Sequence, residues 1–302
     1  MIIDFILVAI GFCGILIGTI TDIQKREVAD WLNFMLMISG FMLRLFFSIT
    51  SGDWMMFVWG VAGFAIAFGI ANLMFYTGQW GGGDAKMIMG LGLLFATYRL
   101  PQVITADTSI TINTPLVFFG LFFLYSMLSG AFLGAGYSIY KALQHRKKFR
   151  KEWNKLTATR TFMFGRYGVF AALVALVVLA FVVPDISLRL PLFTLGLLLM
   201  LALYGMTFVR AVEKGCMIDQ VHPDDLVEGD WIVHDIRLQG KHIVGPKDLG
   251  IDEEQIKILR QAQRDGDIGQ IAVKVGMPLV PAFLIGFIIT VVIGTSLFSV
   301  LF

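Results

Sequence analysis

The chain has 302 residues, of which 57% are hydrophobic and 15% charged, and its formal net charge at pH 7 is +2. Soluble globular domains carry about 25% charged residues, so this composition excludes an ordinary soluble protein and indicates one embedded in a lipid bilayer. The two cysteines, Cys13 and Cys216, lie in an apolar and a polar part of the sequence, which predicts neither a disulfide framework nor a cysteine metal site.

Apolar runs in chain order predict about eight transmembrane helices, because a helix needs roughly 17–25 mostly apolar residues to cross a bilayer. We expect the first run to be a retained helix rather than a cleaved signal peptide, since no basic segment precedes it. The predicted fold class is an all-α polytopic membrane protein with a small cytoplasmic α+β insertion. Its helices lie near residues 3–21, 31–50, 54–77, 84–99, 115–140, 167–183, 190–210 and 277–301.

Charges between the helices predict the orientation. Residues 141–166 carry nine Lys/Arg and a single acid, Glu152, and the positive-inside rule places such a segment in the cytoplasm. Counting through eight helices puts both termini outside and places residues 22–30, 78–84 and 211–276 on the cytoplasmic side. We therefore expect a multi-pass protein of the cell membrane, and we interpret the basic run as a topology signal. Binding of anionic lipid or nucleic acid is the alternative interpretation, and no nucleic-acid partner is expected.

The expected organisation has five parts. They are a membrane core at 1–140, a basic cytoplasmic loop at 141–166, two transmembrane helices at 167–210, an acidic cytoplasmic domain at 211–276 and a C-terminal helix at 277–302. The acidic domain holds thirteen Asp/Glu against eight Lys/Arg, and we expect short strands in WIVHDIRL and KHIVG and a helix capped by Asp252. No metal site is expected there, because no familiar ligand spacing relates His222, His234 and His242.

Two aspartates on the predicted cytoplasmic side are the candidates for chemistry. Asp22 ends the first predicted helix in TDIQKREVADWLN, and Asp84 begins the fourth in GQWGGGDAK. An ionisable residue at this depth costs about a few kcal/mol unless it is paired or hydrated, so both are functional candidates. The alternative is structural, with Asp22 as a polar helix end and Asp84 as the cap of a tight loop.

A pair of carboxyl groups that converge at one membrane face can hydrolyse a peptide bond. Like charges that lie close together are not easily ionised at once, so such a pair shares a proton. One carboxylate takes a proton from water while the other carboxyl donates to the scissile carbonyl, which is aspartic peptide hydrolysis. This chemistry needs no metal and no other cofactor.

The residues around Asp84 fit a peptide substrate. Gly81, Gly82 and Gly83 lack Cβ atoms and permit another backbone to approach closely. An extended substrate that hydrogen-bonds there as an added strand would present its peptide bond to Asp84. Lys86 either holds a substrate carbonyl or marks the cytoplasmic end of the helix.

Two further charged residues are expected to be structural. Asp30 precedes Trp31 and is the expected N-cap of the second helix rather than a competitor of Asp22. Arg44 lies inside that helix, where it would reach the interface or pair with an acid in the bundle.

Taken together, Thr21-Asp22 followed by REVADWLN, and GGGDAK before an apolar helix, resemble the type IV prepilin peptidases, especially the archaeal prepilin and prearchaellin (preflagellin) peptidases. Those enzymes are GxGD membrane aspartic proteases. The resemblance implies that Asp22 and Asp84 are catalytic and that Gly81 and Gly83 are the motif glycines. It also implies substrates that are pilin-like precursors with a short basic leader before a hydrophobic helix. The CxxC motif of the bacterial methylating relatives is absent from the sequence, so methylation is not expected.

Two other functions fit the same residues. One is a presenilin-like or signal-peptide-peptidase-like protease, although both aspartates here come early in the chain and a long extension follows them. The other is a transporter or channel that uses Asp22 and Asp84 as a proton or cation site. The sequence leaves open which precursor a peptidase of this kind would cut.

Overall fold

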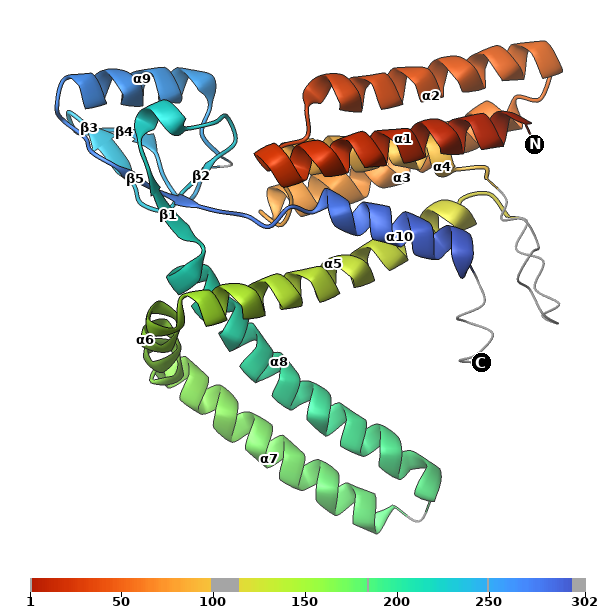
Figure 1. Cartoon of the computed structure of the whole chain (residues 1–302). Helices are drawn as coiled ribbons and strands as arrows, with labels where there is room; N and C mark the ends of the chain where they lie inside the picture. Colours follow the sequence, from red (N-terminus) through yellow and green to blue (C-terminus); the bar gives the residue numbers. More distant parts are fainter. Residues whose placement is uncertain (1, 99–113, 184, 249, 295–302) are drawn as a thin grey trace. The chain divides into compact units, whose positions relative to one another are not determined.

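The computed structural model describes residues 2–98, 114–183, 185–248 and 250–294. Their contacts form two compact units (Figure 1). We call residues 1–135 and 276–302 the core unit, and residues 136–275, which interrupt it in sequence, the inserted unit. One helix, α5, continues from the first unit into the second.

The core unit is built from helices. They are α1 (Ile2–Lys25), α2 (Asp30–Ser51), α3 (Met55–Tyr76), α4 (Gly82–Phe95), the larger part of α5 (Val117–Gln144) and α10 (Val280–Val292). Among the described residues, six helices are long and apolar enough to cross a membrane, namely α1, α2, α3 and α5, together with α7 (Arg160–Val182) and α8 (Arg189–Cys216) of the inserted unit. These helices confirm the predicted class, an all-α polytopic membrane protein with a small sheet region.

The two remaining predicted spans are shorter than expected in the described residues. α4 has 14 residues and α10 has 13. At 1.5 Å per residue each is roughly 20 Å long, against roughly 30 Å for the hydrocarbon core of a bilayer. Residue 99 of the fourth predicted helix and residues 295–301 of the last lie outside the described residues. Hydropathy alone does not separate a short buried helix from a spanning one, because both are apolar.

α4 is the most enclosed helix of the core unit, and it packs between α2 and α3. Nearly all of its residues from Ala85 to Phe95 are buried. A Cβ atom on Gly63 of α3 would overlap the carbonyl oxygen of Gly92 in α4, so these helices approach each other through small residues. The position of Asp84 is therefore set by a helix that neighbours hold on several sides.

Arg44 of α2 is fully buried and binds the far end of α4. Its guanidinium donates to three backbone carbonyl oxygens, those of Met56, Leu93 and Leu94, at 2.9, 2.8 and 3.2 Å. It also donates to Thr97 Oγ1 at 3.1 Å, and Thr97 donates in turn to Asp4 Oδ1 at 2.7 Å. A cation there satisfies carbonyl groups that the end of a helix leaves without partners. This agrees with the expected structural role of Arg44.

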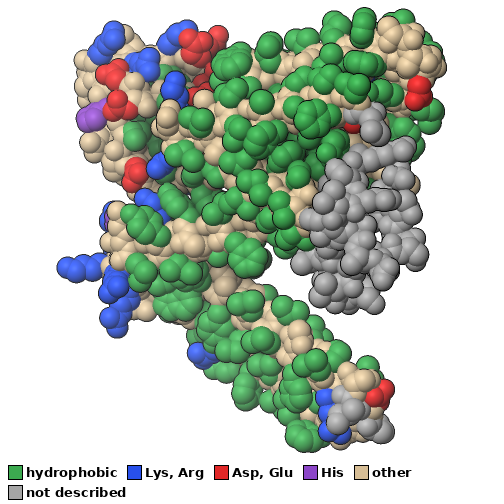
Figure 2. All heavy atoms as spheres, turned by 45° about the vertical axis from the view of Figure 1, so that its right-hand side comes forward, with side chains coloured by type: hydrophobic (Ala, Val, Ile, Leu, Met, Phe, Trp, Pro, Cys, Tyr) green, Lys and Arg blue, Asp and Glu red, His purple; other side chains and the backbone are tan. Residues whose placement is uncertain are grey.

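Large apolar side chains are exposed on the outer faces of the long helices, as Figure 2 shows. Phe132 and Phe181, for example, are 79% and 77% exposed. A soluble protein rarely exposes so much contiguous apolar surface, whereas a bilayer covers it at no cost. The structure thus gives this surface the properties of one that faces lipid.

The inserted unit begins with three helices. α6 (Arg146–Thr157) packs on α8, and the rings of Phe149 and Phe208 lie 5.4 Å apart. α7 and α8 lie side by side and are joined through the short helix η1 (Ile186–Leu188) (Figure 1). The expected loop at 141–166 is therefore largely helical, since it contains the end of α5, all of α6 and the start of α7. Phe149, Trp153 and Leu156 are spaced as on one face of a helix, but the many charged residues between them make the segment resemble a polar loop in the sequence.

The small polar domain of the inserted unit contains two antiparallel sheets. In the first, β5 (Ile271–Lys274) lies between β1 (Ile218–Val221) and β2 (Trp231–Ile232). In the second, β3 (Ile236–Leu238) pairs with β4 (Lys241–Val244). WIVHDIRL is thus divided between two sheets rather than forming one strand. A short helix, η2 (Pro223–Asp225), connects β1 to the remainder of the domain.

α9 (Glu253–Arg264) begins as the sequence predicts, with Asp252 as its N-cap. Asp252 Oδ1 accepts from the Gln255 backbone N at 2.7 Å, and Gln255 Oε1 accepts from the Asp252 backbone N at 3.0 Å. This reciprocal pair is a capping box. Ile256 and Leu259 of α9 then pack with Ile232 and Val273 in the core of the domain.

Candidate active site

Asp22 lies in the last turns of α1 and is only 4% exposed. Its Oδ2 atom accepts a hydrogen bond from the backbone N–H of Val280 at 2.8 Å, and the carboxyl group also accepts from the backbone N–H of Leu279. Leu279 and Val280 are the N-cap and first residue of α10. A helix N-terminus offers unpaired N–H groups and a positive dipole end, so it suits a carboxylate. Asp22 of the first helix thereby caps the last described one.

Asp84 is the third residue of α4 and is half-buried. Its carboxyl group accepts a hydrogen bond from the backbone N–H of Gly81, the N-cap residue of the same helix. A side chain at the third helical position that reaches back to the N-cap N–H is one half of a capping box. This geometry agrees with the expectation that Asp84 lies at the start of the fourth helix, and it also fits the structural alternative in which Asp84 caps a tight loop.

The carboxyl groups of Asp22 and Asp84 lie near enough for their charges to repel each other. Each accepts its own backbone hydrogen bonds, and among the described residues no hydrogen bond joins the two side chains. The core unit therefore brings near each other the two aspartates that the sequence singled out.

The three glycines before Asp84 have different surroundings. Gly83 lies against the segment between α1 and α2, where a Cβ atom would stand 3.0 Å from the carbonyl oxygen of Val28. At Gly82 the nearest atom to such a Cβ is 3.8 Å away, in the ring of Phe75, and at Gly81 it is Asp84 Oδ2 at 3.5 Å. Close packing thus requires glycine at position 83, whereas the backbone leaves space beside the other two.

Asn33 and Val28 complete the support of the Asp84 segment, and sequence reasoning did not assign them. Asn33 of α2 is fully buried, and its Nδ2 donates to the carbonyl oxygen of Gly83 at 3.1 Å. Its Oδ1 atom is buried without a hydrogen-bond partner among the described residues. A buried polar residue inside an apolar helix was a signal in the sequence, because such a group requires a partner.

Lys86 forms an ion pair with Asp30. Its Nζ lies 2.7 Å from Asp30 Oδ1 and 5.9 Å from the ring centroid of Phe34. The pair is largely exposed, so it contributes on the order of 0–1 kcal/mol. Asp30 is the first residue of α2 and Ala29 is the N-cap, so the expectation of Asp30 as N-cap was wrong. The carboxylate binds Lys86 of α4 instead.

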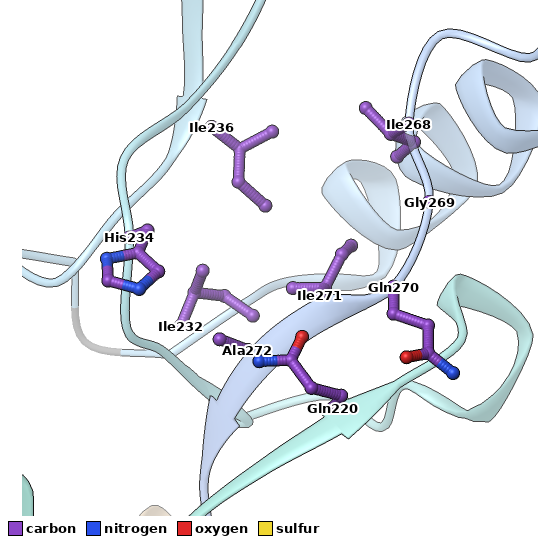
Figure 3. A pocket seen from close by; sticks show the side chains of 9 residues that line it. All are labelled: Gln220, Ile232, His234, Ile236, Ile268, Gly269, Gln270, Ile271 and Ala272. Atoms are coloured by element: carbon purple, nitrogen blue, oxygen red, sulfur yellow. The ribbon is translucent and has the colours of Figure 1, made fainter.

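A separate pocket of about 260 Å³ lies in the small polar domain (Figure 3). Its wall is formed by isoleucines, and its polar groups come from His234, Gln220 and Gln270. None of the residues that line it is an acid. The pocket therefore lacks the carboxyl groups that distinguish the Asp22–Asp84 site.

Comparison with known proteins points to the same part of the chain. Residues 9–139 match the model of the type IV leader peptidase family. The preflagellin peptidase of Methanococcus voltae is 39% identical over 93 residues, which are 31% of this chain and 40% of that protein. The preflagellin peptidase of Methanococcus maripaludis (strain C6) is 32% identical over 121 residues, 38% of this chain and 52% of that protein.

A third relative, the preflagellin peptidase of Methanocaldococcus jannaschii, is 37% identical over 92 residues, 30% of this chain and 39% of that protein. The chain thus spans about half or less of the length of these curated relatives. The family match includes Asp22, Asp84 and the three glycines, but not α10. Residues 9–139, which belong to the helical membrane region, are therefore similar to the type IV leader peptidase family.

Proposed function

We propose that the protein is an aspartic endopeptidase that removes leaders from prepilin-like and prearchaellin-like precursors, with Asp22 and Asp84 as the catalytic pair. The observation that carries the proposal is the convergence of these two buried or half-buried carboxyl groups within a family-matched region. The names of the three relatives, all preflagellin peptidases, support the substrate class.

In the proposed reaction, one carboxylate takes a proton from a water molecule whose oxygen attacks the scissile carbonyl carbon. The other carboxyl, which is protonated, donates its proton to the carbonyl oxygen. The gem-diol collapses as the peptide nitrogen takes a proton, the C–N bond breaks and the leader leaves with a new carboxyl group. The hydrogen bond from Val280 holds Oδ2 of Asp22 in place during these steps.

The proposed substrate path runs beside Gly81 and Gly82. Space beside their backbones supports the approach of an extended peptide, which would add main-chain hydrogen bonds next to Asp84. Gly83 permits the start of α4 to lie against Val28, and so it positions the site. Lys86, which is partly exposed beside Asp30, is proposed to contact the substrate near the membrane surface.

We further propose that the site faces the cytoplasm. Asp22 ends α1 and Asp84 begins α4, and helices that alternate in direction bring these ends to one membrane face. The basic residues that follow α5 belong to that face in the same scheme, and the positive-inside rule assigns such residues to the cytoplasm. Cleavage would then release leaders on the side where precursors are made.

The test is leader removal from a purified preflagellin by wild type, Asp22→Asn and Asp84→Asn. Each substitution is expected to abolish cleavage, because one carboxyl group alone cannot alternate between base and acid. Asp53→Asn removes an exposed acid at another position and serves as a matched control that keeps activity. Cleavage that survives at either site aspartate defeats the proposed pair. Proton flux in vesicles without cleavage would favour a transporter.

A further inference from the structure

The helix α6 carries six Lys/Arg within 12 residues, and the proposed peptidase reaction uses none of them. All six side chains are exposed: Arg146, Lys147, Lys148, Arg150, Lys151 and Lys155. Among the described residues, no ion pair involves any of these six. Acidic partners among the described residues therefore do not account for this concentration of positive charge.

The charges of α6 are arranged on one side. Phe149 and Trp153, which are four residues apart, share the face that packs toward α8, and Leu156 is half-buried one turn further on. Lys147, Lys151 and Lys155 follow the same four-residue spacing and therefore form a stripe on the opposite face. α6 is thus a basic amphipathic helix whose apolar side is already occupied by its own protein.

The neighbouring elements fix where this stripe lies. One residue separates α6 from α5 and two residues separate it from α7, and both α5 and α7 are long and apolar enough to cross a membrane. Figure 1 shows α6 almost end-on where α7 and α8 run lengthwise, so its axis crosses theirs at one end of the pair. A helix held across the end of a transmembrane pair lies at the membrane–water boundary.

The groups on neighbouring helices add to the positive charge. Lys141 lies in the last turn of α5, Arg160 begins α7, and α8 contributes Arg210 and Lys214 near its C-terminal end. Within α6 and α8 the acids are Glu152 and Glu213, and Glu213 pairs with Lys274 at 2.7 Å. This end of the inserted unit is therefore strongly basic.

The first turn of α6 indicates that the missing counter-charge is an anion supplied from outside. Arg146, Lys147 and Lys148 stand at the positive end of the helix dipole, where cations are unfavourable, and His145 provides no side-chain cap. An anion beside this turn would offset both the dipole and the crowded cations. At the membrane boundary the abundant anions are phosphate-bearing lipid headgroups.

We propose that the exposed face of α6 binds anionic phospholipid headgroups and so holds this helix against the membrane surface. Each cation near a charged membrane strengthens association by about 1 kcal/mol, which corresponds to about five-fold. Loss of three cations from the stripe is therefore expected to weaken binding by more than about ten-fold. This surface acts in addition to any role of the same residues in setting topology.

The test uses the full chain purified in a neutral detergent, where the topology of insertion no longer matters. Affinities for fluorescent phosphatidylglycerol and for phosphatidylcholine with the same acyl chains are measured by titration. The triple variant Lys147→Gln/Lys151→Gln/Lys155→Gln is compared with Lys241→Gln/Lys247→Gln/Arg264→Gln, which removes the same charge from exposed positions of the small polar domain. A triple Lys→Arg variant at the first three positions shows whether the charge suffices.

We expect phosphatidylglycerol to bind more tightly than phosphatidylcholine to the wild type, to the control variant and to the arginine variant. The difference in affinity should decrease as the salt concentration rises. The glutamine variant at α6 is expected to lose that preference while its thermal unfolding stays unchanged. Equal affinity of wild type for the two lipids overturns the proposal, and so does an α6 variant that binds like wild type. Tighter binding of an oligonucleotide than of phosphatidylglycerol to the wild type would also overturn it, by identifying a nucleic-acid surface.

Discussion

Replacing Gly83 with alanine is expected to loosen the contact between the start of α4 and the segment after Asp22. The new Cβ atom would stand 3.0 Å from the carbonyl oxygen and 3.1 Å from the Cβ of Val28. Val28 is 3% exposed, and its backbone cannot turn aside as a flexible side chain would. Excess volume in a packed site costs typically about 1–3 kcal/mol, so the free energy of unfolding should fall by that amount.

The same change should also reduce the rate of catalysis. Gly83 immediately precedes Asp84, so a shift that relieves the clash moves this carboxyl relative to Asp22. A displacement of about 1 Å at a reacting group can cost on the order of 100-fold in rate. We therefore expect kcat for leader removal to fall by at least about ten-fold in protein that is still folded.

Gly82→Ala is the matched control for packing. Its Cβ atom would meet only the ring of Phe75 at 3.8 Å, and the residue stands in the first turn of α4 with an ordinary helical backbone. Alanine is preferred to glycine inside helices by up to about 1 kcal/mol, so stability should stay equal or rise. If the substrate backbone passes here, the added methyl group should raise KM for the precursor.

The assay combines thermal unfolding in detergent with initial rates of preflagellin cleavage over a range of substrate concentrations. Wild type, Gly82→Ala and Gly83→Ala are compared in the same preparation. A Gly83→Ala protein as stable and as active as wild type refutes the packing explanation. A Gly82→Ala protein with unchanged KM and kcat refutes the proposed approach of substrate beside that glycine.

Three further changes test other parts of the structure. Arg44→Leu removes the guanidinium that donates to the carbonyl groups of Met56, Leu93 and Leu94, so the free energy of unfolding, measured by thermal unfolding, should fall by about 3 kcal/mol or more. Arg210→Leu, at an exposed site, should change the free energy of unfolding by less than about 0.5 kcal/mol. Equal losses in the two variants would contradict the structural role assigned to Arg44. Asp252→Ala removes the capping box of α9 and should lower the stability of that helix by about 0.5–2 kcal/mol, which would be measured as faster amide hydrogen exchange in α9. Asp267→Ala, the control, should leave hydrogen exchange in α9 unchanged. Burial raises the pKa of the Asp230 carboxyl above its ordinary value of 3.8. Above the raised pKa the carboxyl is ionised in the folded protein, and its burial lowers the free energy of unfolding. This loss of stability disappears as the pH falls toward 3.8, where the group is protonated. Asp230→Asn, which keeps an acceptor for the Val227 N–H, should therefore stabilise the small polar domain against urea at pH 7 and have no effect near about pH 4; stabilisation at both values would contradict this reasoning.

The long helices and the α9 cap could be predicted because their causes are local. An apolar run of sufficient length must form a helix in a bilayer, and Asp252 followed by Gln255 is a complete capping signal within four residues. Asp22 and Asp84 were likewise identified from short motifs. Asp30 was misassigned, because its preferred partner, Lys86, lies 56 residues away and not in its own helix.

Other features depend on contacts between residues that are far apart in the sequence, and no local sequence pattern predicts them. β1 and β5 pair Ile218 with Lys274, and strands of four residues are too short to show a clear alternation of burial. The packing of Gly83 on Val28 has the same sequence signature as a flexible loop. The cap that Asp22 places on α10 involves two apolar stretches whose compositions resemble those of any membrane helix.

That cap has a consequence for biosynthesis. The hydrogen bond joins residues 258 positions apart, so Val280 is translated long after Asp22 has entered the membrane. Until α10 is inserted, the carboxyl group of Asp22 must be satisfied by water or headgroups instead of a helix N-terminus. A nascent chain would therefore acquire its finished aspartate geometry only after residue 280 has been translated. Pulse-labelled ribosome-bound chains released before and after residue 280 would reveal this order, because only the longer ones should cut a precursor.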